Sequence, residues 1–485
     1  MRAALVYECT LNIMLTKAGA VIVHKGGAGV DNPSSEDGVV DRRTFLTSSA
    51  VVASAVGLAS TGLLSGASAS AASKKLLGVT GSTLNFDCCL PISGAFTIIT
   101  KPWAAAMRYA CDEVNAAGGL KIAGKRIKVH SPLIDEGYAA APATVSVQKF
   151  LTQGGHFVGG FVSEEAPVAI EGFNVPADLL MTCCINGTPA LLPDKLRFFE
   201  DALTQATGGI RADFAYNELG LRKIATIELS NSWGAAYQTT FAKAFTELGG
   251  EIVSRDYMAV TDTDFSATIS AWKPKKPDGI YIIIGDGPGT TIASQATQLG
   301  FDSVPFLTEG AWDPNSYLAT GKSYIDRCYY LAEYPYSHWN SEIAALTHRL
   351  WKDEKMHTTN WFWQGYDSTR MVLAAMELAG STDPRGVMAA LPEAIVKGKN
   401  RWLVKAQGAV ATKTKGVYLK TPVWMAKFKP VTADLLSGAP LVPVAGHKYQ
   451  GAQGWMPAKW SGYSQPNANV APPSISQLKS LGVIA

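Results

Sequence analysis

The stretch DEVNAAGGLKIAGKRIKV, residues 112–129, holds the end of one predicted element and the start of the next. A helix is predicted over residues 101–119, and Gly118 and Gly119 end it, because glycine is common just beyond a helix C-terminus. The segment RIKVHSPLI, residues 126–134, is predicted to be a strand. A helix, a glycine turn and a strand in immediate succession indicate an α/β fold.

Strands and helices alternate on both sides of this stretch. Short apolar strands are predicted at 84–92, 156–161 and 179–185, with helices at 142–154 and from Glu165 onward. Apolar strands of this length between amphipathic helices are typical of parallel sheets that are covered on both faces.

The alternation restarts after residue 200. Strands are predicted at 223–229, 251–258, 279–287 and 304–310, with a helix before each. Two such series predict two doubly wound, Rossmann-like lobes. Parallel sheets bind ligands at the carboxyl ends of their strands. The residues that directly follow predicted strands are Ser93, Ser163, 186–188, Trp233, 285–289 and Glu309.

Residues 1–72 have the pattern of an export leader. Arg42 and Arg43 precede Phe45 and Leu46, and a run of small and mildly apolar residues leads to an A-x-A cleavage pattern at 69–72. Arg-Arg-x-Phe-Leu resembles the twin-arginine signal for export of folded proteins. A buried N-terminal helix is the alternative, and residues 1–40 are either a long leader or the product of an early start codon. We therefore expect the mature chain in the periplasm.

The composition fits a globular protein of two or three domains. About 413 residues remain after the leader, with 47% hydrophobic and 17% charged residues over the whole chain. The net charge of +3 gives no indication of a nucleic-acid partner. No segment after the leader has the length of an apolar membrane span.

The motifs of common enzymes are missing from the sequence. There is no G-x-S-x-G, no H-E-x-x-H and no histidine pair in metal-ligand spacing. The GKS at 321–323 has Ser316 where a phosphate-binding loop has its first glycine, and GDGPGT at 285–290 has Thr290 at the third glycine position of a dinucleotide fingerprint. We therefore expect no enzyme activity, no cofactor and no metal.

Six cysteines follow the leader, and they form no C-x-x-C pair of the kind that binds structural zinc. An exported protein can form disulfides. The vicinal pairs leave three interpretations open: buried small side chains, a disulfide between the strands, or a metal or thiol function. The paired residues are Cys88 with Cys89 and Cys183 with Cys184, and the others are Cys111 and Cys328.

Five stretches, in this order, resemble the Leu/Ile/Val-binding branch of the periplasmic solute-binding proteins of ABC importers, which have the type I binding-protein fold. They are LPISG (90–94), residues 112–129, VGGFVSEEAPVAI (158–170), NSWGAAYQTTFAKAFTELGGEIV (231–253) and FLTEG (306–310). The resemblance covers roughly residues 83–430.

The resemblance implies two lobes joined by three crossovers, near residues 200, 333 and 402. Lobe one is then 76–200 plus 333–402, and lobe two is 201–332 plus 403–485.

The resemblance also implies a ligand site. In the family, hydroxyl and backbone N–H groups bind the ligand's carboxylate, and an acid binds its ammonium group. By motif, Ser163 is the first hydroxyl, Gly187 or Thr188 is the second anchor, and Glu309 is the acid. The alternatives are a helix N-cap for Ser163 and a solvated carboxylate for Glu309.

Aromatic residues mark a departure from the family. Phe96 and Trp103 stand where the family often has small residues and a Tyr-Gly loop. Trp233, in contrast, matches the family, because with Gly234 it resembles the aromatic-Gly pair that starts a helix of lobe two. Residues 359–367 add Trp361, Trp363 and Tyr366 near the third crossover. An aromatic pocket makes aromatic acids, amides and urea-like compounds as plausible as branched-chain amino acids.

The resemblance implies a monomeric receptor that closes on an amino acid or a similar polar solute and delivers it to a membrane ABC permease. Two alternatives stay open. The first is an extracytoplasmic sensor, or an accessory partner of an exported redox enzyme, with the same fold. The second is an exported enzyme of unrecognised type.

Overall fold

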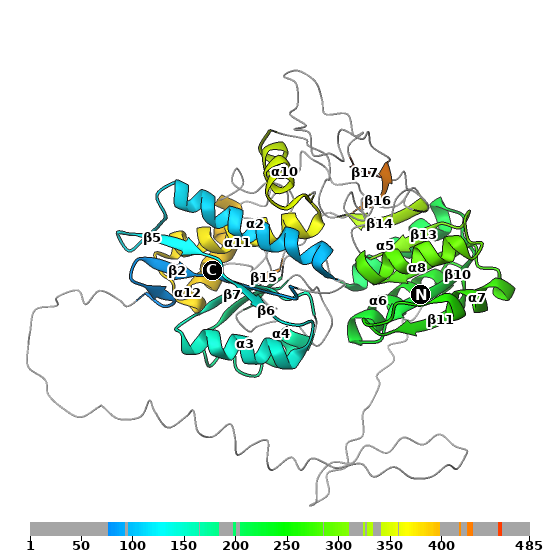
Figure 1. Cartoon of the computed structure of the whole chain (residues 1–485), viewed down its shortest axis with the longest axis horizontal. Helices are drawn as coiled ribbons and strands as arrows, with labels where there is room; N and C mark the ends of the chain where they lie inside the picture. Colours follow the sequence, from blue (N-terminus) through cyan, green and yellow to red (C-terminus); the bar gives the residue numbers. More distant parts are fainter. Residues whose placement is uncertain are drawn as a thin grey trace, which may run out of the picture. The chain divides into compact units, whose positions relative to one another are not determined.

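The computed structural model describes most of residues 76–397 and three short strands beyond (Figure 1). Contacts divide the chain into two units, Met1–Ser73 and Lys74–Ala485. All described residues lie in the second unit, so the proposed export signal lies outside them. The described ranges are 76–92, 96–163, 165–183, 197–199, 204–284, 286–309, 324, 327–332, 341–356, 358–397, 417–418, 424–429 and 454–457.

Lobe one is built on a six-stranded sheet with the order β15-β9-β8-β7-β3-β6, in which neighbouring strands are parallel. Figure 1 shows α3 and α4 on one side of this sheet and α2 and α11 on the other. The strands are β3 (Asp87–Leu90), β6 (Leu133–Asp135), β7 (Phe157–Gly160), β8 (Leu180–Cys183), β9 (Arg197–Phe199) and β15 (Val417–Tyr418). The helices are α2 (Thr97–Ala116), α3 (Ala140–Thr152), α4 (Glu165–Ile170), α10 (Ser341–Glu354), α11 (Asn360–Ala379) and α12 (Pro384–Lys397).

The glycines of the opening stretch shape a small second sheet, of order β1-β2-β5-β4. Gly119 has a φ of +85°, and a Cβ there would lie 2.6 Å from the carbonyl oxygen of Ile127. Ala123 and Gly124 also have positive φ, so the chain turns tightly and β4 pairs with β5 as a hairpin. The strands are β1 (Val79–Thr80), β2 (Thr83–Asn85), β4 (Leu120–Ile122) and β5 (Lys125–His130).

Two predicted strands are each divided between these sheets. The segment 84–92 forms the end of β2 and then β3, and the segment 126–134 forms β5 and then part of β6. The second break includes Pro132, which has no N–H to donate to a ladder. The prediction of strands at these positions is therefore correct, but the division between two sheets was not foreseen.

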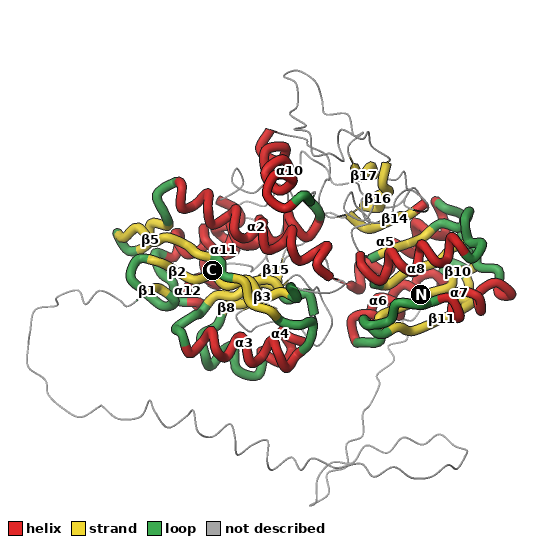
Figure 2. The backbone as a smooth tube through the Cα atoms, in the orientation of Figure 1, coloured by secondary structure: helices red, strands yellow, loops and turns green. Residues whose placement is uncertain are grey.

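Lobe two is built on a seven-stranded sheet with the order β11-β10-β12-β13-β14-β16-β17, parallel from β11 to β14. Figure 2 shows strands of this sheet, among them β10 and β11, in yellow. Its strands are β10 (Lys223–Leu229), β11 (Glu251–Met258), β12 (Gly279–Ile283), β13 (Phe306–Thr308), β14 (Cys328–Ala332), β16 (Trp424–Lys429) and β17 (Gly454–Pro457). Its helices are α5 (Thr204–Asp213), continued by a π-helical turn at Phe214–Glu218, α6 (Ser232–Glu247), α7 (Ser266–Trp272) with a 3₁₀ turn at Lys273–Lys275, and α8 (Asp286–Gln298).

Each lobe has its own hydrophobic core. One core includes Phe86, Trp103 and Met181, and the other includes Ile227, Phe241 and Ile282. The prediction of a two-lobed α/β protein with parallel sheets is confirmed. Beyond α12, β15 pairs with β9 of lobe one and β16 pairs with β14 of lobe two. The expected crossover near residue 402 lies outside the described residues.

Candidate functional site

The loop after β7 holds Ser163 in a constrained backbone. Gly160 has a φ of +109°, and a Cβ there would lie 2.4 Å from the carbonyl oxygen of Cys89. Phe161 has a φ of +61°, which non-glycine residues rarely adopt, and its N–H donates to that same oxygen at 2.7 Å. This conformation directs the N–H groups of Val162 and Ser163 to one acceptor, Glu136.

Glu136 occupies the position in which a ligand carboxylate was expected. Its Oε1 accepts the N–H groups of Val162 at 2.9 Å and Ser163 at 3.1 Å, and its Oε2 accepts the Ser163 hydroxyl at 3.4 Å. The Ser163 hydroxyl also accepts the N–H of Ala166 at 3.3 Å. Ser163 therefore acts as a helix cap near the start of α4 while it contacts an acid of its own chain.

The carboxyl group of Glu136 is fully buried. Burial raises the pKa of this group from 4.5 to about 8, although the hydrogen bonds from Ser163 and Val162 oppose the rise. At neutral pH the protonated, uncharged form of Glu136 is therefore favoured.

Glu309 lies directly after β13 and is paired inside lobe two. Nη2 of Arg211, on α5, is 2.5 Å from Oε2 of Glu309, and the hydroxyl of Tyr281 donates to Oε1. The side chains of Arg211 and Glu309 are only 3% and 2% exposed, which excludes the solvated carboxylate considered from the sequence. Burial raises the pKa of Glu309 and the guanidinium opposes that rise. We take the pair as ionised, because a neutral Glu309 would leave a buried cation uncompensated.

Two nitrogens of Arg211, Nε and Nη1, are buried and have no hydrogen-bond partner within the described part of the chain. Its guanidinium carbon lies 5.6 Å from the centre of the Tyr237 ring and 6.0 Å from that of Tyr281. The ring of Tyr237 in turn lies 4.6 Å from that of Trp233. The side chain of Arg211 is thus fixed by Glu309 and by the rings of Tyr237 and Tyr281, and N–H donors on Nε and Nη1 remain unused.

Aromatic side chains connect the two cores. Tyr138 and Trp361 from lobe one, and Trp233 from lobe two, each pack against both hydrophobic cores, as does the aliphatic Val260. We call Tyr138, Trp233 and Trp361 the aromatic group. Phe96 is buried and stacks on Tyr138, with ring centres 4.1 Å apart and planes within 7°. Phe96 and Trp233 were both expected at the ligand site. Trp233 belongs to the aromatic group, and Phe96 contacts it through Tyr138.

Other residues singled out in the sequence lie elsewhere. Trp103, Trp363 and Tyr366 are buried in packed clusters, and the Tyr366 hydroxyl donates to Glu113. In the glycine-rich segment 285–290, the residues from Asp286 onward form the first part of α8. Ser93, Gly187 and Thr188 lie outside the described residues.

Three of the four cysteines in the vicinal pairs are described by the structure. Cys88, Cys89 and Cys183 are free and buried. Strand β7 lies between β3 and β8, so these strands are about 10 Å apart, beyond the Cα separation that a disulfide allows. Burial raises the pKa of all three thiols. Cys184 lies outside the described residues.

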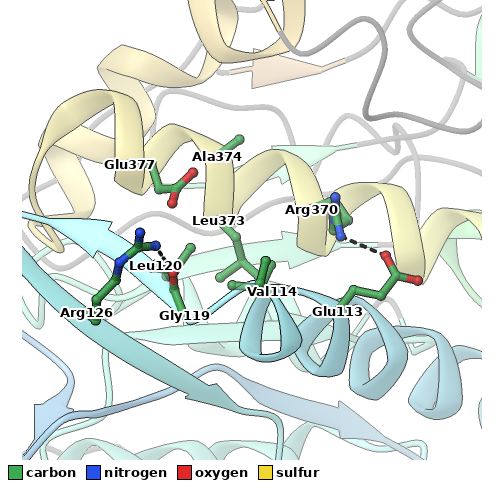
Figure 3. Close-up of a pocket in the computed structure, with 10 residues that line it drawn as sticks. Glu113, Val114, Gly119, Leu120, Arg126, Arg370, Leu373, Ala374 and Glu377 are labelled. Carbon is green, nitrogen blue, oxygen red and sulfur yellow. Dashed lines mark hydrogen bonds and ion pairs between the residues drawn. The ribbon is translucent and has the colours of Figure 1, made fainter.

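A groove of about 350 Å³ lies at the other end of α2, between its last turn, β4 and α11 (Figure 3). Arg370 pairs with Glu113 there at 2.8 Å, and Arg126 donates to the carbonyl of Gly119 at 3.2 Å. A 20-residue helix is roughly 30 Å long. The groove is therefore remote from Phe96, at the start of α2.

The sequence reasoning missed Glu136, Tyr138 and Arg211. Glu136 and Tyr138 directly follow β6, which was not predicted as a separate strand. Arg211 falls within a predicted helix, where a charged residue on the buried face was the available signal.

The chain belongs to the periplasmic binding protein family, whose model matches residues 89–429. A Leu/Ile/Val-binding protein homolog of Brucella abortus is 20% identical over 200 residues, which are 41% of this chain and 50% of the relative. The chain thus spans about half the length of the curated relatives it matches.

Two solved structures have the same fold. A leucine-binding protein from Thermotoga maritima is 18% identical with a TM-score of 0.58, covering 71% of this chain and 95% of its own. A fatty acid ABC transporter substrate-binding protein from Thermomonospora curvata is 15% identical with a TM-score of 0.63, covering 82% and 97%. Membership of this family implies an extracytoplasmic location. None of the described helices is long and apolar enough to cross a membrane.

Proposed function

We propose that this chain is the extracytoplasmic substrate-binding component of an ABC importer, which captures an amino acid or a related small polar solute and delivers it to a membrane permease. The observation that carries this proposal is the aromatic group, which packs against the cores of both lobes. Each lobe also has a buried polar cluster at the ends of its strands: Glu136 with the loop after β7 in lobe one, and Arg211 with Glu309 after β13 in lobe two. Such an arrangement suits closure of two lobes on a solute, because the closed state then buries surface from both.

We further propose that residues 1–72 direct export through the twin-arginine route, with Arg42 and Arg43 as the signal. Phe96 and Trp233 are proposed as ligand contacts, and Gly187 and Thr188 as further anchors. Ser163 and Glu309 are proposed to act through Glu136 and Arg211, which they hold in place.

A ligand screen by thermal shift tests the proposal. The purified full chain is heated with amino acids, aromatic acids, short fatty acids, amides, urea and diamines. A ligand at 100 times its dissociation constant should stabilise the protein by about 2.7 kcal/mol. Trp233→Ala should weaken the stabilisation. Tyr257→Ala is the matched control, because Tyr257 is 57% exposed on β11. A panel with no stabilising solute would contradict the proposal.

Uptake of a labelled hit by cells with and without the intact gene then separates transport from sensing. Loss of uptake on deletion is expected. Tight binding with unchanged uptake would instead favour the sensor with the same fold.

A further inference from the structure

The guanidinium of Arg211 is a buried cation with unused donors. Its side chain is 3% exposed, only Nη2 has a recorded partner, and Nε and Nη1 have none within the described ranges. Buried donors that lose their water without gaining a partner destabilise a protein, so each such group in a folded chain calls for an acceptor. An arginine presents five N–H donors and no acceptor, and its natural partners are carboxylates and phosphates.

The surroundings of Arg211 place it next to the surface shared by the two cores. Its guanidinium lies beside the ring of Tyr237, and Tyr237 contacts Trp233, which packs against both cores. Its partner Glu309 follows β13 at the carboxyl end of that strand. Ligands of parallel sheets bind at this end.

The alternative anchor for a ligand carboxylate is already filled. The N–H groups of Val162 and Ser163 both donate to the fully buried Glu136. A ligand could use these donors only by displacing a side chain of the protein.

Glu309 is likewise a poor receptor for an ammonium group. Its negative charge is compensated by Arg211, and its two oxygens already accept from Arg211 and from Tyr281. The pair has no net charge and presents only N–H donors, so it favours an anion over a cation.

We propose that Arg211 binds the carboxylate of the ligand through its open N–H groups, with Glu309 as a positioning residue, and that the ligands are monocarboxylates which need no α-ammonium group. This inference rests on the proposed function, since it names the solute class of that same site. Two matched series test it. The first is 3-phenylpropanoate, L-phenylalanine and 3-phenylpropanamide, and the second is 4-methylpentanoate, L-leucine and 4-methylpentanamide.

Isothermal titration of the full chain should show each carboxylate binding at least as tightly as its amino acid, and at least about tenfold more tightly than its amide, as expected for a hydrogen bond to a charged group. The double variant Arg211→Met with Glu309→Gln removes both charges together and should abolish the preference over the amide. Arg255→Gln is the matched control, because Arg255 also pairs with a buried acid of lobe two, Glu228, at 2.9 Å. It should retain the preference.

Circular dichroism of the double variant shows whether it is folded, and Arg211→Lys provides a second variant that keeps the charge but changes the donor geometry. It should weaken carboxylate binding while amide binding stays unchanged. Equal binding of carboxylate and amide by the wild-type chain, or binding of the amino acids alone, would overturn the inference and leave the proposed function in place. Failure to bind any solute of the wider screen would overturn both.

Discussion

Replacing Glu136 with glutamine should stabilise the protein, and by an amount that grows with pH. The side chain is fully buried, and its carboxyl accepts two backbone N–H groups that a glutamine carbonyl can also accept. The pKa of Glu136 rises from 4.5 to about 8 on folding. The folded state therefore keeps a proton that the unfolded chain releases.

The sign and size follow from proton linkage. Below about pH 4.5 both states are protonated, and the neutral Glu136 contributes its full stability. Between about pH 4.5 and 8 only the unfolded state loses the proton, so the free energy of unfolding falls by roughly 1.4 kcal/mol per pH unit. The loss amounts to about 3 kcal/mol at pH 7 and about 5 kcal/mol above pH 8. Glutamine does not titrate and escapes this loss.

Urea denaturation at pH 5, 7 and 8.5 measures the difference between Glu136→Gln and the wild-type chain. The variant should gain little at pH 5 and several kcal/mol at pH 8.5. Glu251→Gln is the control, since that side chain is 63% exposed. Burial also raises the pKa of Asp87, to about 7, and that of Glu309. Both groups remain in the two proteins, so the difference isolates Glu136. A gain that is the same at all three pH values, or a uniform loss, would refute the reasoning.

Three further predictions concern stability and reactivity. Cys88, Cys89 and Cys183 should react with iodoacetamide only in denaturant, because their thiols are buried and have raised pKa values. Peptide mass spectrometry measures the labelling, and labelling of these cysteines in the native protein would contradict the prediction. Gly119→Ala should destabilise by more than about 1 kcal/mol in urea denaturation because of its positive φ and the clash with Ile127, whereas Gly209→Ala, in open space on α5, should not destabilise. Asn231→Ala should lower the free energy of unfolding by about 1 kcal/mol in the same assay, because it removes the N-cap of α6 and the contact to Glu165. Asn231→Asp should keep the cap.

The alternation of strands and helices was predictable because buried parallel strands need continuous apolar runs, and KIATIEL and GIYIIIGDG satisfy that need locally. The hairpin at Ala123–Gly124 and the division of two strands between sheets were harder to predict from the sequence. Which sheet a strand joins depends on partners such as the β2–β5 and β3–β7 pairs, and no local pattern specifies them. The pairing of β15 with β9 depends in the same way on a distant partner.

The site shows the same division between local signals and distant partners. A motif places Ser163 and Glu309 at strand ends, because strand ends follow from local pattern. It does not reveal that Glu136, from 27 residues earlier, takes the donors of the serine loop, or that Arg211, from 98 residues earlier, pairs with the acid. Both partners come from other elements of the same lobe, and both reverse the chemistry that the motif implies. An acid of the protein takes the donors that were expected to bind a ligand carboxylate, and a cation accompanies the acid that was expected to bind an ammonium group. The two changes are consistent with each other, since a chain that has closed one carboxylate site and opened donors at another would still bind a carboxylate, from the opposite lobe.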